Sequence, residues 1–367
     1  MISPDFGFPN SGIKESPLIA KTLKGIKPLD QGMMAKARAH QDNLTKPRGS
    51  LGRLEELAIK ICGIRGELHP KITGKRVIVF AGDHGVVEEG VSAYPKDVTA
   101  QMVLNFLSGG AGINAIAEIM GAEVEVVDVG VDFDFPDLTR LVAEKIRRGT
   151  FNLARGPAME VEDALEALEV GIERANFARK KGIELIAGGD MGIGNTTSAT
   201  ALFCAYLGLP PLKVAGPGTG LLPEQVRRKA RVIAKALRMN HAALSDPLET
   251  LAALGGFEIA GLAGLYLGAA KNRMVALVDG FIATAGALAA IKICPALSEH
   301  LIFSHLSDEP GHKLILEKMG VKPLLHLGMR LGEGTGACLA MALIESALAC
   351  HNQMATFKSA GVSDRVK

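Results

Sequence analysis

The chain has 367 residues, with 41 basic and 39 acidic side chains and a formal net charge of +2. This balance excludes an electrostatic nucleic-acid binder, which would carry a strongly basic face or tail. Hydrophobic residues make up 48% of the chain, which excludes wholesale disorder and suffices for one large domain plus an appendage, or for two domains.

The expected location is the cytoplasm. Five scattered cysteines without a C-x-x-C pair argue against a disulfide framework or a zinc ribbon and favour a reducing compartment. The N-terminus lacks the basic-then-apolar order of a signal peptide. The apolar stretches Ile259–Ala270 and Phe281–Ile291 are shorter than the ~20 residues that span a bilayer, so no membrane partner is expected.

In chain order, residues 1 to about 30 hold prolines without a period and predict an irregular arm. Residues 33–64 predict helix interrupted at 46–50, because apolar residues recur at three- and four-residue spacing. Short, continuously apolar runs then alternate with helical stretches, which favours a parallel sheet covered on both faces. The predicted strands are 77–80, 124–129, 183–187, 274–278, 301–303 and 324–327.

Polar and glycine residues follow these predicted strands, at the carboxyl edge where open α/β sheets bind ligands. The predicted fold is therefore a three-layer, Rossmann-like α/β domain. A last helix, 337–349, is apolar nearly all round and is expected to dock against the N-terminal helices or a second subunit.

Two glycine-rich loops suit a phosphorylated ligand. Residues 188–198 (GGDMGIGNTTS) run from a predicted strand into a helix that Asn195 or Thr196 could cap, and the positive end of that helix favours an anion. Residues 216–220 (GPGTG) precede a basic helix that contains Lys229. A plain strand–helix turn and a solvated basic face are the alternatives. The first loop lacks both the lysine of a Walker loop and the acid of a dinucleotide fingerprint.

Three further segments could carry chemistry. His305, Asp308 and His312, with His84, have the spacing of a loop metal site, although hydrogen-bonding or capping roles are commoner for such residues. Glu333 stands between glycines before an apolar helix, where apolar walls would raise its pKa toward that of a general base; a helix-terminus carboxylate is the equal alternative. Gln101 could present an amide to a planar heterocycle, or simply lie on a helix surface.

Taken together, these segments resemble the nicotinate-nucleotide–dimethylbenzimidazole phosphoribosyltransferases. The resemblance runs in order through KPRGSLG, AGDHGV, GVSAYP, GDMGIGNTT, GPGTG, VDGF, SHLSDEPGH and LGEGTGA, and it covers nearly all of the chain after about residue 20. One departure is Asp190, a position at which the family often has glutamate.

The resemblance implies a large α/β domain (46–336), a small helical domain built from both chain ends (1–45 and 337–367), and a homodimer. It implies that nicotinate mononucleotide and 5,6-dimethylbenzimidazole are the substrates, with no cofactor and no metal. It assigns Glu333 as the general base. The residues that it places against substrate are Gln101, Asp190, Met191, Gly192, Gly218, Lys229, Asp279, Ser307 and Leu331.

Three alternatives stay open beside this transferase. A metal-dependent hydrolase would use His84, His305, Asp308 and His312. A nicotinamide-dependent dehydrogenase would use the glycine loops, and a non-catalytic nucleotide-binding protein would keep the phosphate loops without needing Glu333. The preferred base, which could be a substituted benzimidazole, adenine or a phenol, does not follow from the sequence.

Overall fold

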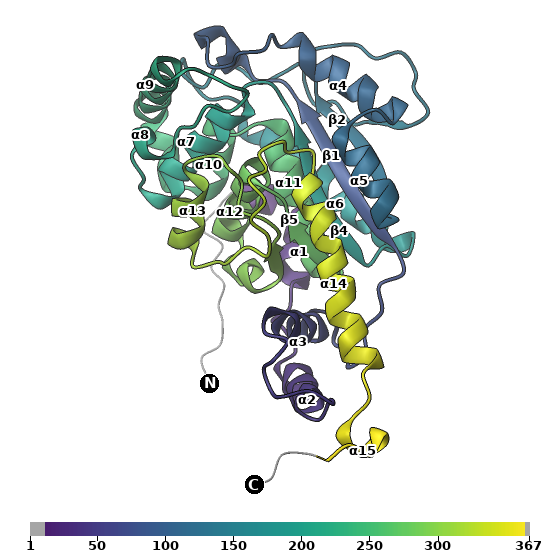
Figure 1. The fold of residues 1–367 in the computed structure, drawn as a ribbon. Coiled ribbons are helices and arrows are strands. Elements are labelled where there is room, and N and C mark those ends of the chain that lie inside the picture. The colour runs from purple at the N-terminus through teal and green to yellow at the C-terminus, as the bar shows by residue number, and fades with distance from the viewer. Residues whose placement is uncertain (1–11, 364–367) are drawn as a thin grey trace.

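The computed structural model describes residues 12–363, except for the side chains of Lys14 and Glu15. Its helices are α1 (Pro17–Gly25), α2 (Gln31–Asp42), α3 (Arg53–Arg65), α4 (Asp97–Ser108), α5 (Gly112–Met120), α6 (Val161–Lys180), α7 (Asn195–Leu207), α8 (Pro211–Val214), α9 (Pro223–Met239), α10 (Pro247–Leu254), α11 (Phe257–Lys271), α12 (Phe281–Ile293), α13 (His312–Met319), α14 (Thr335–Gln353) and α15 (Phe357–Ala360). Figure 1 shows them around a central sheet.

The sheet has six parallel strands in the order β3-β2-β1-β4-β5-β6. They are β1 (Lys75–Gly82), β2 (Glu123–Gly130), β3 (Leu141–Ala143), β4 (Leu185–Met191), β5 (Val275–Val278) and β6 (Leu301–Phe303). The chain runs outward from β1 to β3, returns to β4 beside β1, and runs outward again to β6. This is the doubly wound order of Rossmann folds, with its switch point between β1 and β4, and it confirms the predicted fold class.

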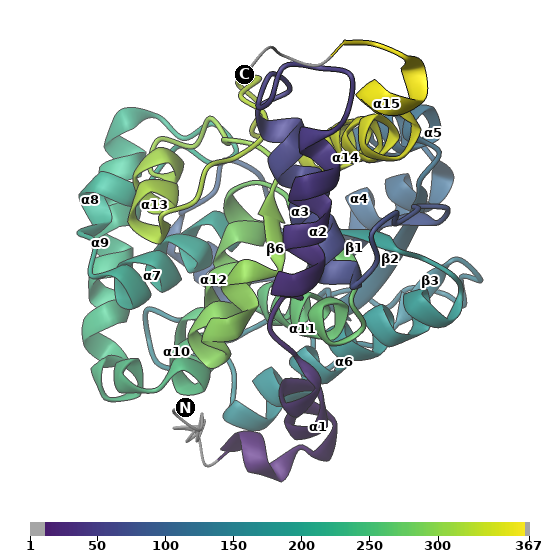
Figure 2. The same ribbon diagram turned by 90° about the horizontal axis from the view of Figure 1, so that it is seen from below.

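Helices cover both faces of the sheet, which gives three layers (Figure 2). Alternate side chains of β1 enter different cores: Ile78 and Phe80 pack with α6, α11 and α12, whereas Val77 and Val79 pack with α3, α5 and α14. This two-residue alternation, with apolar residues on both sides, explains why the strands are continuously hydrophobic.

The predicted apolar stretch near residue 260 is the buried core helix α11. The backbones of α11 and α6 are in direct contact where the two helices cross. A Cβ on Gly171 of α6 would lie 2.0 Å from the carbonyl oxygen of Gly261. A Cβ on Gly264 of α11 would lie 2.0 Å from the carbonyl oxygen of Leu168. Glycines at the crossing therefore let the two helices approach closely enough to fill the layer under the sheet.

One segment, Asp97–Met120, is long and apolar enough to cross a membrane by length and composition, and 28% of its most apolar window is buried. The structure divides it into α4 and α5 at Gly109, whose φ of +80° ends α4. Val103 and Phe106 of α4 and Ile113 of α5 pack into the core beside the sheet. The segment thus contributes to the outer helical layer.

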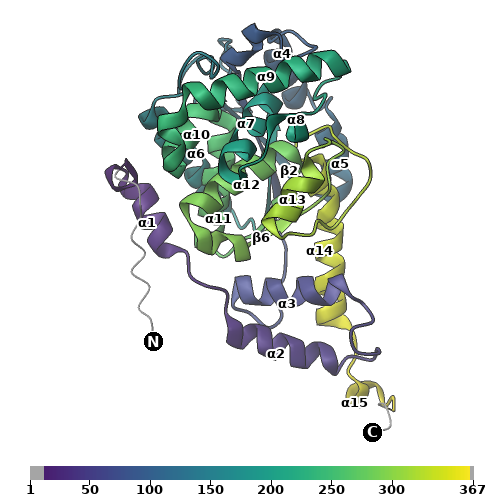
Figure 3. The ribbon, with the colours of Figure 1, turned by 90° about the vertical axis from the view of Figure 1, so that its left-hand side faces the viewer.

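Both chain ends contribute to a helical lobe below the sheet (Figure 3). In it α2 packs against α3, α3 packs against α14, and Leu44 forms an antiparallel bridge with Thr356. Because α3 belongs by number to the predicted large domain, the boundaries at 45/46 and 336/337 remain predictions.

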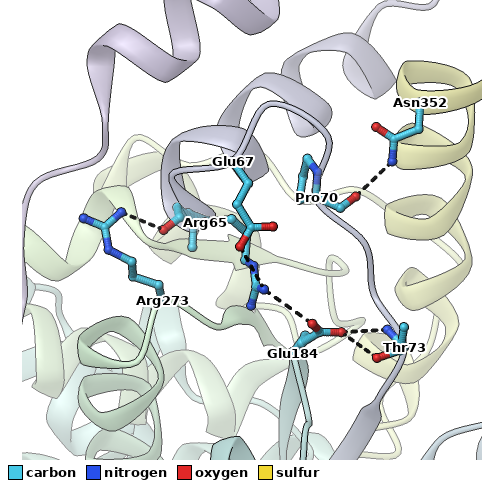
Figure 4. Close-up of polar contacts among 8 residues, drawn as sticks. Arg65, Glu67, Pro70, Thr73, Glu184, Arg273 and Asn352 are labelled. Atoms are coloured by element: carbon cyan, nitrogen blue, oxygen red, sulfur yellow. Dashed lines mark hydrogen bonds and ion pairs between the residues drawn. The ribbon is translucent and has the colours of Figure 1, made fainter.

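Polar contacts tie this lobe to the sheet (Figure 4). The carboxylate of Glu184, just before β4, accepts hydrogen bonds from Thr73 at 2.7 Å and from Arg65 of α3 at 3.4 Å. The side-chain amide of Asn352 in α14 donates to the carbonyl of Pro70 at 2.9 Å. The α3–β1 segment is therefore fastened to both β4 and α14.

Three element predictions were wrong. Part of the predicted irregular arm is helix α1, where the Ser16 hydroxyl accepts from Ile19 N–H and Pro17 takes the first turn; residues 1–11 of that arm lie outside the described residues. The predicted strand 324–327 is only a single parallel bridge between Leu325 and His305, flanked by Pro323 and Gly328. Strand β3, a partly exposed three-residue edge strand between Arg140 and Glu144, was missed.

Candidate active site

A cavity of about 240 Å³ opens at the carboxyl ends of β4, β5 and β6. Its walls come from the β4–α7 loop, the 216–220 loop, the start of α12, the segment after β6, and the loop before α14. The lining residues are Tyr94, Asp190, Met191, Gly192, Ile193, Asn195, Thr196, Gly218, Thr219, Gly280, Phe281, Ile282, His305, Ser307, Glu309, Arg330, Leu331 and Gly332.

Glycines bring the β4–α7 loop close to its neighbours. A Cβ on Gly192 would lie 2.3 Å from the carbonyl oxygen of Gly82, and Gly194 has a φ of +98°. Gly194, rather than the predicted Asn195 or Thr196, caps α7; the Asn195 amide instead donates to Asp190 at 3.0 Å. The N-terminus of α7 thus reaches the cavity wall, where its backbone N–H groups favour an anion.

Cationic groups border the same side of the cavity. The buried ammonium of Lys229 donates to the Thr196 hydroxyl at 2.7 Å and to the carbonyl of Gly216 at 3.3 Å. Arg330 donates to the carbonyl of Gly218 at 2.8 Å. Burial lowers the pKa of Lys229 to about 8, although nearby Glu309 acts in the opposite direction. Two cations and a helix N-terminus suit a phosphate group.

Glu309 lies between these cations. Burial raises the pKa of its carboxyl group, while Lys229 and Arg330 act to lower it. Its Oε2 is buried without a hydrogen-bond partner, beside Gly216, where a Cβ would lie against this oxygen. The charge of this carboxylate moderates the positive potential that surrounds the 216–220 loop.

Glu333 stands in strained backbone between two left-handed glycines, with φ values of +82°, +61° and +83° for residues 332 to 334. Its Oε2 accepts a hydrogen bond from the N–H of Ile113 at 3.1 Å, in the first turn of α5. Burial raises the pKa of Glu333, the Ile113 N–H lowers it, and Asp279 raises it. A carboxylate with a raised pKa in a site of this kind can act as a general base.

Two further buried carboxyl groups belong to the site: Asp190 in the cavity wall and Asp279 beside it. Burial, and then the charge of Asp279, raise the pKa of Asp190 well above its usual range. Burial also raises the pKa of Asp279, against the lowering effect of His305. The Asp279 carboxylate accepts from the N–H of Ala337 at 2.8 Å, which fixes the start of α14 directly after Glu333.

The predicted site residues fall into three groups. Asp190, Met191, Gly192, Gly218, Ser307 and Leu331 line the cavity. Lys229 and Asp279 are buried beside it, and Glu333 is buried next to Leu331 and Gly332, which line the cavity. Gln101 is exposed on α4, outside the wall, because α4 turns Thr99, Val103 and Phe106 inward instead.

Sequence reasoning did not single out Tyr94, Phe281, Glu309 or Arg330 as site residues, although all four line the cavity. Arg330 could have been identified from the sequence, because it is a basic residue three positions before Glu333 and just after the predicted strand 324–327. Phe281 had none, because a phenylalanine that opens an apolar helix resembles any core residue.

Three of the four residues of the alternative metal site have other partners: His84, His312 and His305, whose Nε2 lies 3.6 Å from Asp279 Oδ1. His84 pairs with Glu258 at 2.7 Å in a fully buried contact; burial lowers its pKa, but Glu258 and Asp83 together raise it, so the net shift is upward. His312 accepts from the N–H of Ser307 at 2.8 Å, and burial lowers its pKa to about 3. Asp308 is exposed. The geometry does not favour a metal-dependent hydrolase.

A family model described as phosphoribosyltransferase matches residues 26–362. The chain belongs to this family. It is 52% identical to the nicotinate-nucleotide–dimethylbenzimidazole phosphoribosyltransferase of Chlorobaculum tepidum over 94% of this chain and 97% of that one. It is also 52% identical to the enzyme of that name from Geobacter sulfurreducens, over 95% and 99%.

The fold agrees with that family over the whole domain. A crystal structure of the phosphoribosyltransferase of that name from Thermus thermophilus matches with a TM-score of 0.87 and 49% identity, covering 92% of this chain and 100% of that one. A phosphoribosyltransferase is a pentosyltransferase, so this chain is an enzyme of the glycosyltransferase class.

Proposed function

We propose that this phosphoribosyltransferase moves the 5-phosphoribosyl group of nicotinate mononucleotide to 5,6-dimethylbenzimidazole or a related base, giving α-ribazole 5′-phosphate and nicotinate. Near-complete coverage by relatives that carry this name is the observation on which the proposal rests. The cavity supports it, because one side offers cations and a helix N-terminus, and the other offers apolar residues that include Leu331, with the buried Glu333 two positions further along the chain.

The phosphate group binds at the cationic side of the cavity. The ammonium of Lys229, the guanidinium of Arg330 and the N-terminus of α7 converge near Thr196 and Gly218. A dianionic phosphate there would gain charge-assisted hydrogen bonds and would replace the backbone carbonyl as partner of Arg330. The ribose would then extend toward the carboxyl ends of β4 and β5.

Glu333 accepts the proton that the benzimidazole loses. In nicotinate mononucleotide the ring nitrogen is already a pyridinium, so the nicotinate leaves without protonation at that nitrogen. The attacking benzimidazole nitrogen bonds to C1′ from the opposite side, which inverts C1′, and its other N–H becomes acidic. Ile113 holds Glu333 Oε2, which leaves Oε1 to take that proton.

One assay tests the reaction. The purified chain is incubated with nicotinate mononucleotide and 5,6-dimethylbenzimidazole, and the products are separated by chromatography and identified by mass. Formation of α-ribazole phosphate with an equal amount of nicotinate is expected. Release of nicotinate without the new nucleotide would instead indicate a hydrolase, and the proposal would fail.

We further propose a cytoplasmic homodimer. All five cysteines are free thiols, as a reducing compartment allows. Large apolar side chains are exposed on the α4–α5 layer, with Ile119 of α5 at 80% of its full exposure and Leu104 of α4 at 40%. A second copy that covers this face would bury them near the Glu333–Ile113 contact.

A further inference from the structure

Three histidines that the proposed reaction does not use converge in the helical lobe. His40 lies in the last turn of α2, His69 in the loop between α3 and β1, and His351 in the last turn of α14. Their ring centroids are 4.7 to 5.7 Å apart. One potential ligand atom from each ring lies within 4.8 Å of the other two.

Each ring is oriented by an oxygen that accepts its N–H. His40 Nε2 donates to the carbonyl of His351 at 2.8 Å, His351 Nε2 donates to the carbonyl of Leu68 at 2.8 Å, and His69 Nδ1 donates to the side-chain oxygen of Asn352 at 3.3 Å. Such an outer acceptor is typical of metal-binding histidines, because it fixes the tautomer and leaves the lone pair of the other nitrogen available.

The surroundings keep these rings positioned. Asn352, which accepts from His69, also donates to the carbonyl of Pro70, and this contact joins α14 to the loop that carries His69 (Figure 4). The Gln41 amide nitrogen lies 2.9 Å from His351 Nδ1, while its Oε1 is buried without a hydrogen-bond partner. Gln41 is thus the one neighbour that must turn to free the third lone pair.

The neighbouring Cys62 is not counted as a ligand, because its S–H donates to the Leu68 carbonyl at 3.3 Å.

We propose that His40, His69 and His351 form a binding site for a divalent transition-metal ion of the zinc class, which clamps the two chain ends together. Imidazole nitrogens suit zinc, nickel, cobalt or copper, and do not suit magnesium or calcium. Bonds of about 2.0–2.1 Å place tetrahedral ligand nitrogens roughly 3.4 Å apart, so the rings close by up to about 1.4 Å through side-chain rotation. The exposed His69 side leaves a fourth position to water.

The test titrates Zn²⁺, with Mg²⁺ as comparison, into tag-free full-length protein that has been stripped with a chelator. Calorimetry should give one bound Zn²⁺ per chain and no bound Mg²⁺. His69→Ala should weaken Zn²⁺ binding by at least about 10-fold, since even the loss of an outer partner costs about 10–100-fold. His241→Ala, which removes an exposed histidine from the distant 241–245 turn, should bind as the parent does.

A second readout is the melting temperature, which Zn²⁺ should raise in the parent and in His241→Ala but not in His69→Ala. Because His69 is exposed, metal-free His69→Ala should have the same melting temperature as the metal-free parent. If its melting temperature is lower, His40→Gln is used as the test variant in its place. Absence of saturable Zn²⁺ binding, or equal binding by the parent and by the variant that lacks a triad imidazole, would overturn the proposal. Neither readout involves turnover, so the result is independent of the proposed reaction.

Discussion

At the scale of single residues, the position of Glu333 matters as much as its carboxylate. A glutamate with φ of +61° is strained, and the structure retains it between Gly332 and Gly334, with one oxygen on the N–H of Ile113. Strain of this kind, roughly 1–3 kcal/mol for a residue, persists where the surrounding structure enforces it and is concentrated at functional sites.

The first prediction follows from that carboxylate. Glu333→Gln keeps the shape and the contact with Ile113 but cannot take a proton, so kcat should fall about 10²–10⁴-fold while nicotinate mononucleotide still binds. Steady-state kinetics and calorimetric binding measure the two effects. The exposed Glu317→Gln in α13 should leave both unchanged. Undiminished turnover would show that another group takes the proton, or that none is needed.

The second prediction concerns Lys229 and pH. Because burial lowers the pKa of its ammonium to about 8, the free enzyme loses this charge as pH rises through that value. The ratio kcat/KM for nicotinate mononucleotide should therefore be full below pH about 8 and fall above it. Lys229→Gln should raise KM about 10–100-fold, as expected for a lost charged hydrogen bond, and should abolish this fall.

Lys235→Gln is the matched control, because Lys235 lies on the same helix and is exposed. It should keep both the KM and the pH profile of the parent. A profile for Lys229→Gln that still falls above pH 8 would assign the titration to a different group.

At the scale of elements, strand β4 and the loop before α14 are in backbone contact. A Cβ on Gly189 would lie 2.4 Å from the carbonyl oxygen of Glu333 and 2.8 Å from the N of Gly334. Strand β4 thus fixes the position of the Glu333 backbone. The 332–334 turn can pack this closely against β4 only because residue 189 is glycine. This contact joins Gly189 and Glu333, which are 144 positions apart in the chain.

The third prediction uses that contact. Gly189→Ala should displace the backbone at Glu333 and lower kcat by more than 10-fold, in the way that small misplacements of catalytic groups do. It should also lower the midpoint of urea unfolding by an amount that reflects overpacking of about 1–3 kcal/mol. Gly156→Ala, at an open position without positive φ, should change neither quantity. Parent-like activity of Gly189→Ala would show that β4 does not position Glu333.

At the scale of the whole molecule, the α4–α5 layer would connect the proposed dimer to the site. Glu333 accepts from the first turn of α5, and the exposed Ile119 lies in the last turn of the same helix. A second copy that packs on this face would therefore hold α5 in place and support the Glu333 contact from outside.

The fourth prediction is that Ile119→Glu converts a dimer into a monomer. A charge at this exposed position leaves the monomer fold intact but is unfavourable inside an apolar interface. Sedimentation velocity should give the mass of two chains for the parent and of one chain for Ile119→Glu. Met239→Glu, at the exposed end of α9, should remain dimeric. A parent that sediments as one chain, or a dimeric Ile119→Glu, would refute pairing through this face.

The class of fold and the edge of the sheet that carries the cavity could be predicted from the order of amino acids. Continuous apolar runs such as Val77–Phe80 indicate strands buried on both faces, and the glycine and acid tails after them indicate the carboxyl edge. These signals are local, because strand burial and helix starts depend on neighbouring residues. For that reason the amino-acid sequence predicts them. The six predicted residues that line the cavity followed instead from the family resemblance.

The remaining features depend on contacts between segments that are far apart in the chain, and only the folded structure reveals them. It placed Glu333 on the N–H of Ile113 and close to Leu331, left Gln101 on the surface, and reduced 324–327 to one bridge beside β6. It also brought together His40, His69 and His351, which no spacing in the chain connects. Each outcome depends on packing between segments far apart in the chain, and such contacts leave no periodic signal in either segment.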